Sequence, residues 1–233
     1  WVSVEGKLVP CACRGWDQAE IQVNAIAGDG AADHYSFDAF DLARNPTMKN
    51  ALEACRQWGG TAGPPMIALI GPHGCGKTHL ALASIGLLAS LGIPVQYWEV
   101  WRFLDTLRAG MREGAEMPTD QVFQAALDAP VLVLDEYSQH RESDWTNDRM
   151  DNLVSYRYQR RRRTMLISND DRPFEQTVGP RLYSRFTDRE VCRVEFCVGA
   201  RDLRPEMGRL ATIRASGVIR TPLRVGSWRD PLR

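Results

Sequence analysis

Residues 71–78 read Gly71-Pro72-His73-Gly74-Cys75-Gly76-Lys77-Thr78, and His79 follows them. The stretch matches the phosphate-binding loop pattern G-x-x-x-x-G-K-[ST] at every fixed position. Its glycines let backbone N–H groups surround phosphates without Cβ clashes. We expect Lys77 to place its charge beside the β- and γ-phosphates. We expect Thr78 to offer its hydroxyl to Mg²⁺ at a helix N-terminus. The stretch therefore predicts binding of ATP or GTP.

The flanking residues supply the strand and the helix that such a loop needs. Residues 66–70 form a short apolar run, which is typical of a buried parallel strand. Residues 78–91 are apolar nearly all round, as in a buried helix. Gly92 suits the end of that helix, and Pro94 prevents its continuation.

Length and composition predict one α/β domain with short appendages, because the chain has 233 residues, 44% of them hydrophobic and 25% charged. No apolar run reaches the roughly 18 residues needed to span a bilayer, and no signal peptide opens the chain. The chain begins at Trp1, which suggests a fragment. Six scattered cysteines do not form a disulfide framework, so we expect a cytoplasmic protein without a membrane partner.

The charge is divided unevenly along the chain. Residues 151–233 hold 18 Lys and Arg against 10 Asp and Glu, whereas residues 1–150 hold 11 against 19. A basic half beside an acidic half suits a polyanion, an acidic partner or head-to-tail stacking of identical subunits. A merely solvated basic face is the alternative.

A second strand-like run, at 131–134, ends in Asp135-Glu136. Both carboxylates should lie at the carboxyl edge of a parallel sheet, where ligands bind in doubly wound folds. We expect Asp135 to hold Mg²⁺ and Glu136 to act as the catalytic base toward water.

A third strand-like run, at 164–167, ends in Ser168-Asn169. The Asn169 amide could hydrogen-bond the γ-phosphate or the water, or it could simply favour a turn. A helix is predicted over 145–163, and residues 160–163 are four arginines that suit its last turn.

The order of these motifs, followed by Arg181-Leu182-Tyr183-Ser184-Arg185-Phe186, resembles AAA+ ATPases. It is most similar to the bacterial helicase loaders of the DnaC/DnaI type and to the IstB-type helper proteins of transposition. The resemblance covers roughly residues 36–205 and includes Ser36-Phe37-Asp38-Ala39-Phe40-Asp41 and Arg157-Tyr158. It implies an α/β P-loop NTPase fold, an AAA+ core with a central parallel sheet flanked by helices.

The resemblance also implies roles for single residues. Asn169 corresponds to sensor 1, and Arg185 to an arginine finger that acts in trans, which implies a homo-oligomer. Arg181 is the nearby competitor for the finger, and Arg204 is a weaker candidate for a second sensor.

The function implied first is an ATP-dependent loader, which hydrolyses ATP to control assembly of a DnaB-type replicative helicase on single-stranded DNA. One alternative is an IstB-like transposition helper that acts on duplex DNA and a transposase. An alternative of another class is a stand-alone P-loop kinase.

The two ends of the chain form separate segments, and the N-terminal one has two alternative interpretations. Residues 1–35 form a predicted N-terminal segment, which is either a truncated partner-binding region or half of a zinc site made by Cys11, Cys13 and His34. Residues 206–233 read as a loose basic tail.

Local patterns add three smaller expectations. Asn45 should cap a helix that has Pro46 in its first turn. Phe37 and Phe40 are expected in the core rather than beside the adenine. In 97–108 we expect Trp98, Trp101 and Leu104 to form a buried helix face, while Arg102, Arg108 and Arg112 contact solvent or DNA.

Overall fold

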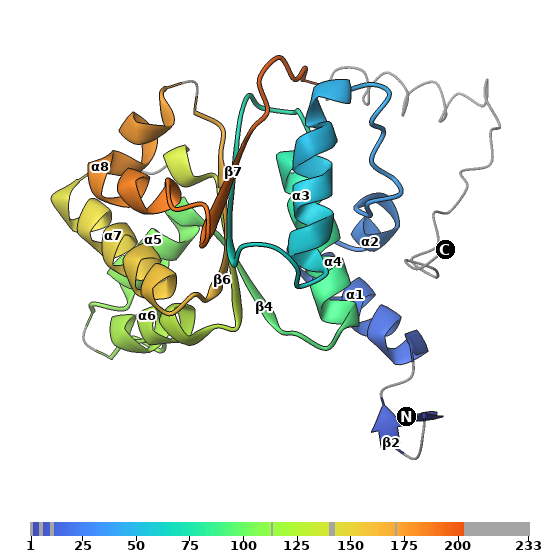
Figure 1. The fold of residues 1–233 in the computed structure, drawn as a ribbon. Coiled ribbons are helices and arrows are strands. Elements are labelled where there is room, and N and C mark those ends of the chain that lie inside the picture. Colours follow the sequence, from blue (N-terminus) through green and yellow to red (C-terminus); the bar gives the residue numbers. More distant parts are fainter. Residues whose placement is uncertain are drawn as a thin grey trace, which may run out of the picture.

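The computed structural model describes residues 2–4, 7–9, 12–112, 114–139, 143–170 and 172–202 (Figure 1). Its centre is a five-stranded parallel sheet in the order β4-β5-β6-β3-β7. The strands are β3 (Met66–Ile70), β4 (Val95–Glu99), β5 (Val131–Asp135), β6 (Arg163–Ser168) and β7 (Cys192–Phe196). The three runs predicted from sequence are therefore strands, and Asp135 and Ser168 are the last residues of theirs.

Helices cover both faces of this sheet (Figure 1). One face carries α3 (Lys49–Gly59) and α4 (Lys77–Ser90), with α1 (Ala12–Ala27), α2 (Ala31–His34) and the short η1 (Pro46–Met48) beside them. The other face carries α5 (Val100–Ala109), α6 (Thr119–Asp128), α7 (Asp144–Gln159) and α8 (Phe174–Phe186). A short η2 (Tyr137–Gln139) follows β5, and β1 (Val2–Val4) pairs antiparallel with β2 (Lys7–Val9).

The two faces of the sheet are filled by alternate residues of the same strands. In β5, Leu132 and Leu134 pack with α5 to α8, whereas Val131 and Val133 pack with α3 and α4. Successive side chains of a strand point to opposite faces, so strands buried on both faces are apolar throughout. By the same alternation Asp135 points to the α4 face of the sheet.

The N-terminal helix α1 packs directly on α4. Gln22 Nε2 donates to the carbonyl of Val95 at 2.6 Å, and a Cβ added at Gly15 would lie 2.3 Å from the Ser90 oxygen. The boundary at residue 36 stays a prediction. The side chains of Cys11 and Cys13, Arg204 and the tail at 206–233 lie outside the described residues.

The helix predicted over 145–163 is shorter than expected. α7 ends at Gln159, Arg161 has a positive φ of 49°, and Arg163 already belongs to β6. The four arginines therefore do not share a last helical turn. The Arg160 guanidinium lies 3.7 Å from the Tyr156 ring centroid, and Arg162 pairs with Asp128 at 3.1 Å.

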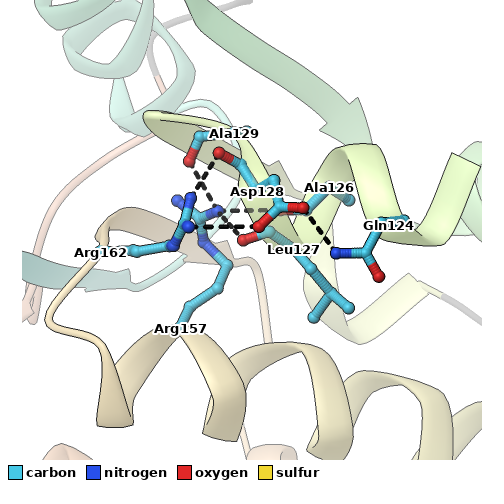
Figure 2. Close-up of polar contacts among 7 residues, drawn as sticks. All are labelled: Gln124, Ala126, Leu127, Asp128, Ala129, Arg157 and Arg162. Atoms are coloured by element: carbon cyan, nitrogen blue, oxygen red, sulfur yellow. Dashed lines mark hydrogen bonds and ion pairs between the residues drawn. The ribbon is translucent and has the colours of Figure 1, made fainter.

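Arg157 of α7 is fully buried and joins its helix to β6 and to the end of α6. Figure 2 shows its contacts at the end of α6. Its Nη1 donates to the carbonyls of Ala126, Leu127 and Ala129 at 2.8, 3.2 and 2.9 Å, at the end of α6. Its Nη2 and Nε donate to the Arg163 carbonyl and to Thr164 Oγ1. The last carbonyls of a helix have no partner within it, so the guanidinium satisfies them. Burial lowers the pKa of Arg157 to about 10, and the positive charge of Arg162 adds to this.

Arg157→Met should lower the free energy of unfolding by about 3–5 kcal/mol, because the buried carbonyls would lose their donors. For a chain of this size the melting temperature should fall on the order of 10 °C, measured by calorimetry or circular dichroism. Arg160→Met, which removes an exposed arginine from the same helix end, should change stability by no more than about 0.5 kcal/mol. Equal melting temperatures for both variants would show that the Arg157 hydrogen bonds contribute little.

Candidate nucleotide site

The phosphate loop joins β3 to α4 and depends on two glycines. Gly74 has φ +70°, and Gly76, the residue before α4, has φ +107°. A Cβ at Gly74 would lie 1.7 Å from Asp202 Oδ1, and one at Gly76 would lie 2.6 Å from the Phe40 ring. Both positions therefore lack room for a side chain and adopt a backbone that glycine favours.

Lys77 is the first residue of α4 and is only 3% exposed. Its Nζ donates to the carbonyls of Gly71 at 2.7 Å and Pro72 at 2.6 Å, and it lies 3.6 Å from Cys75 Sγ. The charge is thus held inside the curve of the loop by weak, neutral acceptors. Phosphate oxygens are stronger acceptors for an ammonium group than these carbonyls.

Thr78 connects the loop to the acid at the end of β5. Its Oγ1 donates to Asp135 Oδ2 at 3.0 Å, and the Tyr97 hydroxyl of β4 donates to the same oxygen at 2.9 Å. Burial and the Asp135 charge raise the pKa of Tyr97, so it remains a donor. Sequence reasoning missed Tyr97, because its position depends on β4 lying next to β5.

Glu136 follows Asp135 in a left-handed backbone conformation, with φ +55°. Its N–H donates to Asp135 Oδ1 at 2.7 Å. Partial burial raises the pKa of Glu136, and the charges of Asp135 and Glu99 raise it further, while a hydrogen bond with Trp101 opposes them. Strained backbone and a raised carboxyl pKa often accompany catalytic positions.

Asn169 and Arg185 differ in how they relate to this loop. Asn169 follows the last residue of β6, so it lies at the same edge of the sheet as Asp135. It is two residues after Ile167, which packs with α4, so the alternation of the strand directs it to the same face. Arg185 lies on α8, donates to the Arg181 carbonyl at 2.7 Å and lies 5.8 Å from the Tyr158 ring centroid. These two neighbours belong to α8 and α7 rather than to the loop.

Residues 35–45 lie beside the loop, and the helix cap expected at Asn45 needs correction. Asn45 precedes η1 without a side-chain cap, and its Nδ2 instead donates to the carbonyls of Cys75 and Arg201 at 3.3 and 3.2 Å. Phe37 and Phe40 are partly buried and pack against the core cluster, and Phe40 also contacts Gly76 and His79. Asn45 thus couples the loop to the segment after β7, a role that no local pattern indicates.

His79 contacts the same segment. Its Nε2 lies 2.8 Å from the Ser36 carbonyl, and its ring contacts Tyr35 and Phe40 edge to face. Burial lowers the pKa of His79, which favours a neutral ring whose Nε2–H donates to Ser36.

The aromatic segment after β4 differs from the predicted buried face. Trp98 belongs to β4 and packs partly into the core, and Leu104 is buried, but Trp101 is 39% exposed. The Arg102 guanidinium lies 5.5 Å from the Trp101 ring centroid. Because a strand ends at Glu99 and the helix begins at Val100, one helical period does not run through all three residues.

The oxygen ligands at this edge fit Mg·ATP. The Thr78 hydroxyl and the Asp135 carboxylate lie in contact at the N-terminus of α4, and hard cations such as Mg²⁺ prefer such oxygens. The same helix end and the glycine amides suit an anion. Within the described ranges, no group of three or more His, Cys, Asp or Glu could hold a metal ion, and no helix has the length and apolarity to cross a membrane.

Comparison with solved structures shows the fold. The chain superposes on AMPPCP-bound DnaA from Aquifex aeolicus with a TM-score of 0.65 at 17% identity, covering 79% of this chain and 66% of that one. It superposes on the DnaC helicase loader with a TM-score of 0.59 at 23% identity, covering 69% and 96%. For DnaI the TM-score is 0.56 at 19% identity, covering 73% and 91%. The predicted AAA+ P-loop NTPase fold is confirmed.

Comparison of sequences shows the family. The model of the IstB-like ATP binding protein family matches residues 42–180, more than half of the chain. A protein of Mycobacterium tuberculosis named as an ATP-binding protein in an insertion sequence is 30% identical over 137 residues, 58% of this chain. The aligned part spans about half of that relative, 53% of its length. The chain belongs to the family of IstB-like ATP-binding proteins.

Proposed function

We propose that this chain is an ATPase of DNA transposition, which binds and hydrolyses Mg·ATP to control the assembly of a transposase on duplex DNA. The observation that carries the proposal is the 3.0 Å hydrogen bond between Thr78 and Asp135, because it joins the phosphate loop to the acid pair. Membership of the IstB-like family and the relative from an insertion sequence support the role in transposition.

Each residue of the site has a separate role in binding or hydrolysing ATP. Thr78 and Asp135 would hold Mg²⁺, which would neutralise charge on the phosphates. Lys77 leaves the carbonyls of the loop and binds the γ-phosphate. Glu136 accepts the proton of the attacking water, and Asn169 hydrogen-bonds the water or the γ-phosphate. The terminal phosphate is transferred to water, and ADP and phosphate are the products.

The second part of the proposal is that the site is completed by a neighbouring subunit. Arg185 lies on α8, and its guanidinium contacts the Arg181 carbonyl of α8 and the Tyr158 ring of α7. A guanidinium supplied by the next subunit stabilises the charge that develops on the γ-phosphate. Such a head-to-tail contact makes the chain a homo-oligomer.

A second candidate is the helicase loader predicted first from the sequence, with a DnaB-type helicase and single-stranded DNA as partners. The superposition that covers 96% of the DnaC helicase loader favours it. The stand-alone kinase is not proposed, because the chain belongs to the family of IstB-like ATP-binding proteins.

The ATPase rate measured with duplex and with single-stranded DNA of equal length tests the proposal. We expect duplex DNA to raise the rate severalfold and Mg·ATP to be required for retention of the transposase on that DNA. A preference for single strands, together with retention of a replicative helicase, would support the second candidate. If neither DNA changes the rate or binds, both candidates are wrong.

A further inference from the structure

Three groups from different parts of the chain donate hydrogen bonds to the Asp135 carboxylate. Its Oδ2 accepts from Thr78 Oγ1 at 3.0 Å and from the Tyr97 hydroxyl at 2.9 Å. Its Oδ1 accepts from the Glu136 N–H at 2.7 Å. Asp135 is only 1% exposed, and a buried ionised carboxylate depends on such donors because it can only accept. These three groups therefore set the orientation of the carboxylate.

Of these three hydrogen bonds, only the one from Tyr97 has no part in the chemistry proposed above. The Thr78 hydroxyl can keep its proton on Asp135 while a lone pair serves the ion, because a hydroxyl has one proton and two lone pairs. The Glu136 N–H belongs to the backbone, so it remains on Oδ1 whatever side chain follows Asp135. The tyrosine hydroxyl thus adds a side-chain constraint on Oδ2 from a strand that supplies no other group of the site.

The sheet fixes the tyrosine as firmly as it fixes the acid. In the pairing of β4 with β5, Tyr97 lies opposite Val133, two residues before Asp135, and Glu99 lies opposite Asp135 itself. Side chains two residues apart on a strand point to the same face, so Tyr97 and Asp135 share the α4 face. The Tyr97 ring is partly buried and packs against the core cluster of that face. The hydroxyl at the end of this long side chain spans the offset along the strands and reaches the carboxylate.

We propose that Tyr97 is a positioning residue of the Mg²⁺ site, whose hydroxyl fixes Asp135 in the orientation that holds the ion. Groups that orient a metal-binding carboxylate commonly change metal affinity by roughly 10–100-fold when they are removed. The inference rests on the proposed function, because Mg²⁺ is expected at Asp135 together with ATP.

A structural role and a positioning role predict different results. A tyrosine that only stabilises the fold would change the melting temperature and leave the response to Mg²⁺ as it is. A tyrosine that positions Asp135 changes the Mg²⁺ concentration that the site requires. In that case excess Mg²⁺ compensates for the missing hydroxyl, which it could not do for a damaged fold.

The test compares Tyr97→Phe with the unmodified chain in titrations with a fluorescent ATP analogue. In EDTA the two affinities should agree within about twofold, because Lys77 and the amides of the loop are unchanged. The Mg²⁺ concentration that gives half of the tightening of nucleotide binding should rise about tenfold in the variant. Excess Mg²⁺ should restore the affinity, and the melting temperature without nucleotide reports any effect on the fold.

Tyr158→Phe is the matched control, because the Tyr158 hydroxyl also donates to an aspartate, Asp188 Oδ2, at 2.7 Å. Asp188 precedes β7, whereas Asp135 ends β5, so the two pairs belong to opposite edges of the parallel sheet. The change removes one hydroxyl and keeps the ring, as in Tyr97→Phe. It should leave the Mg²⁺ dependence of nucleotide binding unchanged.

A measurement on the unmodified chain keeps the inference testable even if Tyr97→Phe does not fold. In NMR spectra of the chain with isotope-labelled tyrosine Cζ, Mg²⁺ added to the nucleotide-bound chain should shift the Tyr97 resonance, because the acceptor of its hydroxyl becomes a metal ligand. The Tyr158 resonance should stay in place.

The possible failures separate this inference from the proposed function. An unchanged Mg²⁺ dependence in Tyr97→Phe, an equal change in Tyr158→Phe, or a Tyr97 resonance that does not move would overturn the inference and leave the nucleotide site intact. If the unmodified chain binds no nucleotide at any Mg²⁺ concentration, the proposed function is wrong and the inference falls with it.

Discussion

Glu136→Gln should leave ATP affinity within about twofold and slow hydrolysis by at least about 100-fold, the range that a positioned general base contributes. The amide is nearly isosteric with the carboxylate, and Asp135 still accepts from the backbone N–H of residue 136. What is lost is the ability to take a proton from water. Steady-state phosphate release and titration with a fluorescent ATP analogue measure the two quantities separately.

The pH dependence of the same variant gives a second check. The raised pKa of Glu136 means that its ionisation costs folding free energy. This cost is absent below the pKa of the unfolded chain and complete above the raised pKa of the folded chain. Glu136→Gln should therefore melt at a higher temperature than the unmodified chain at pH 8, and the difference should shrink as the pH falls. ATP hydrolysis should decline below a pH that is higher than an ordinary carboxyl would give.

Lys77→Ala is the control for this experiment, because it should remove nucleotide affinity itself rather than turnover. If Glu136→Gln hydrolyses ATP at the normal rate, another group accepts the proton and the role given to Glu136 is wrong.

Arg185→Ala should reduce hydrolysis by about 1000-fold, within the range found for arginine fingers, while leaving ATP affinity unchanged. Its guanidinium makes one hydrogen bond to the Arg181 carbonyl, so its removal should cost little stability. The matched control is Arg181→Ala, which removes an exposed arginine one helical turn earlier on α8 and should retain most activity.

Mixing inactive subunits distinguishes action in trans from action in cis. A Lys77→Ala subunit retains Arg185, and an Arg185→Ala subunit retains its phosphate loop. If the arginine acts on a neighbour, the mixture should recover part of the activity that each variant lacks alone. Co-assembly without recovery would contradict the proposed shared site, and loss of activity in Arg181→Ala would transfer the role to that residue.

Much of the site could be predicted because it lies in continuous motifs. The loop at 71–78 follows β3, the acid pair begins at the last residue of β5, and the amide follows β6, as the sequence predicts. Each follows a run of apolar residues, and the carboxyl ends of parallel strands meet at one edge. Local composition is therefore enough to bring these groups to the same part of the sheet.

The residues that were missed depend on which strands are neighbours. Tyr97 reaches Asp135 only because β4 pairs with β5, and Cys197 lies against Gly71 only because β7 pairs with β3. Asn45 hydrogen-bonds the carbonyl of Cys75, which is 30 positions away, and that of Arg201, which is 156 positions away. In the sequence, Arg157 belongs to a stretch that resembles AAA+ ATPases. In the structure its guanidinium donates hydrogen bonds to carbonyls at the end of α6. Strand order and such distant contacts leave no periodic signal in a single sequence.

The alternation of side chains along the strands has a consequence for deletions. Tyr97, Asp135, Asn169 and Cys197 share the parity that faces α4, so losing one residue inside a strand would turn its terminal group toward α5 to α8. Conservative replacements of the apolar residues should be far less harmful than any change in their number. The spacing within each of these strands thus positions the groups of the candidate nucleotide site as much as the identity of those groups does.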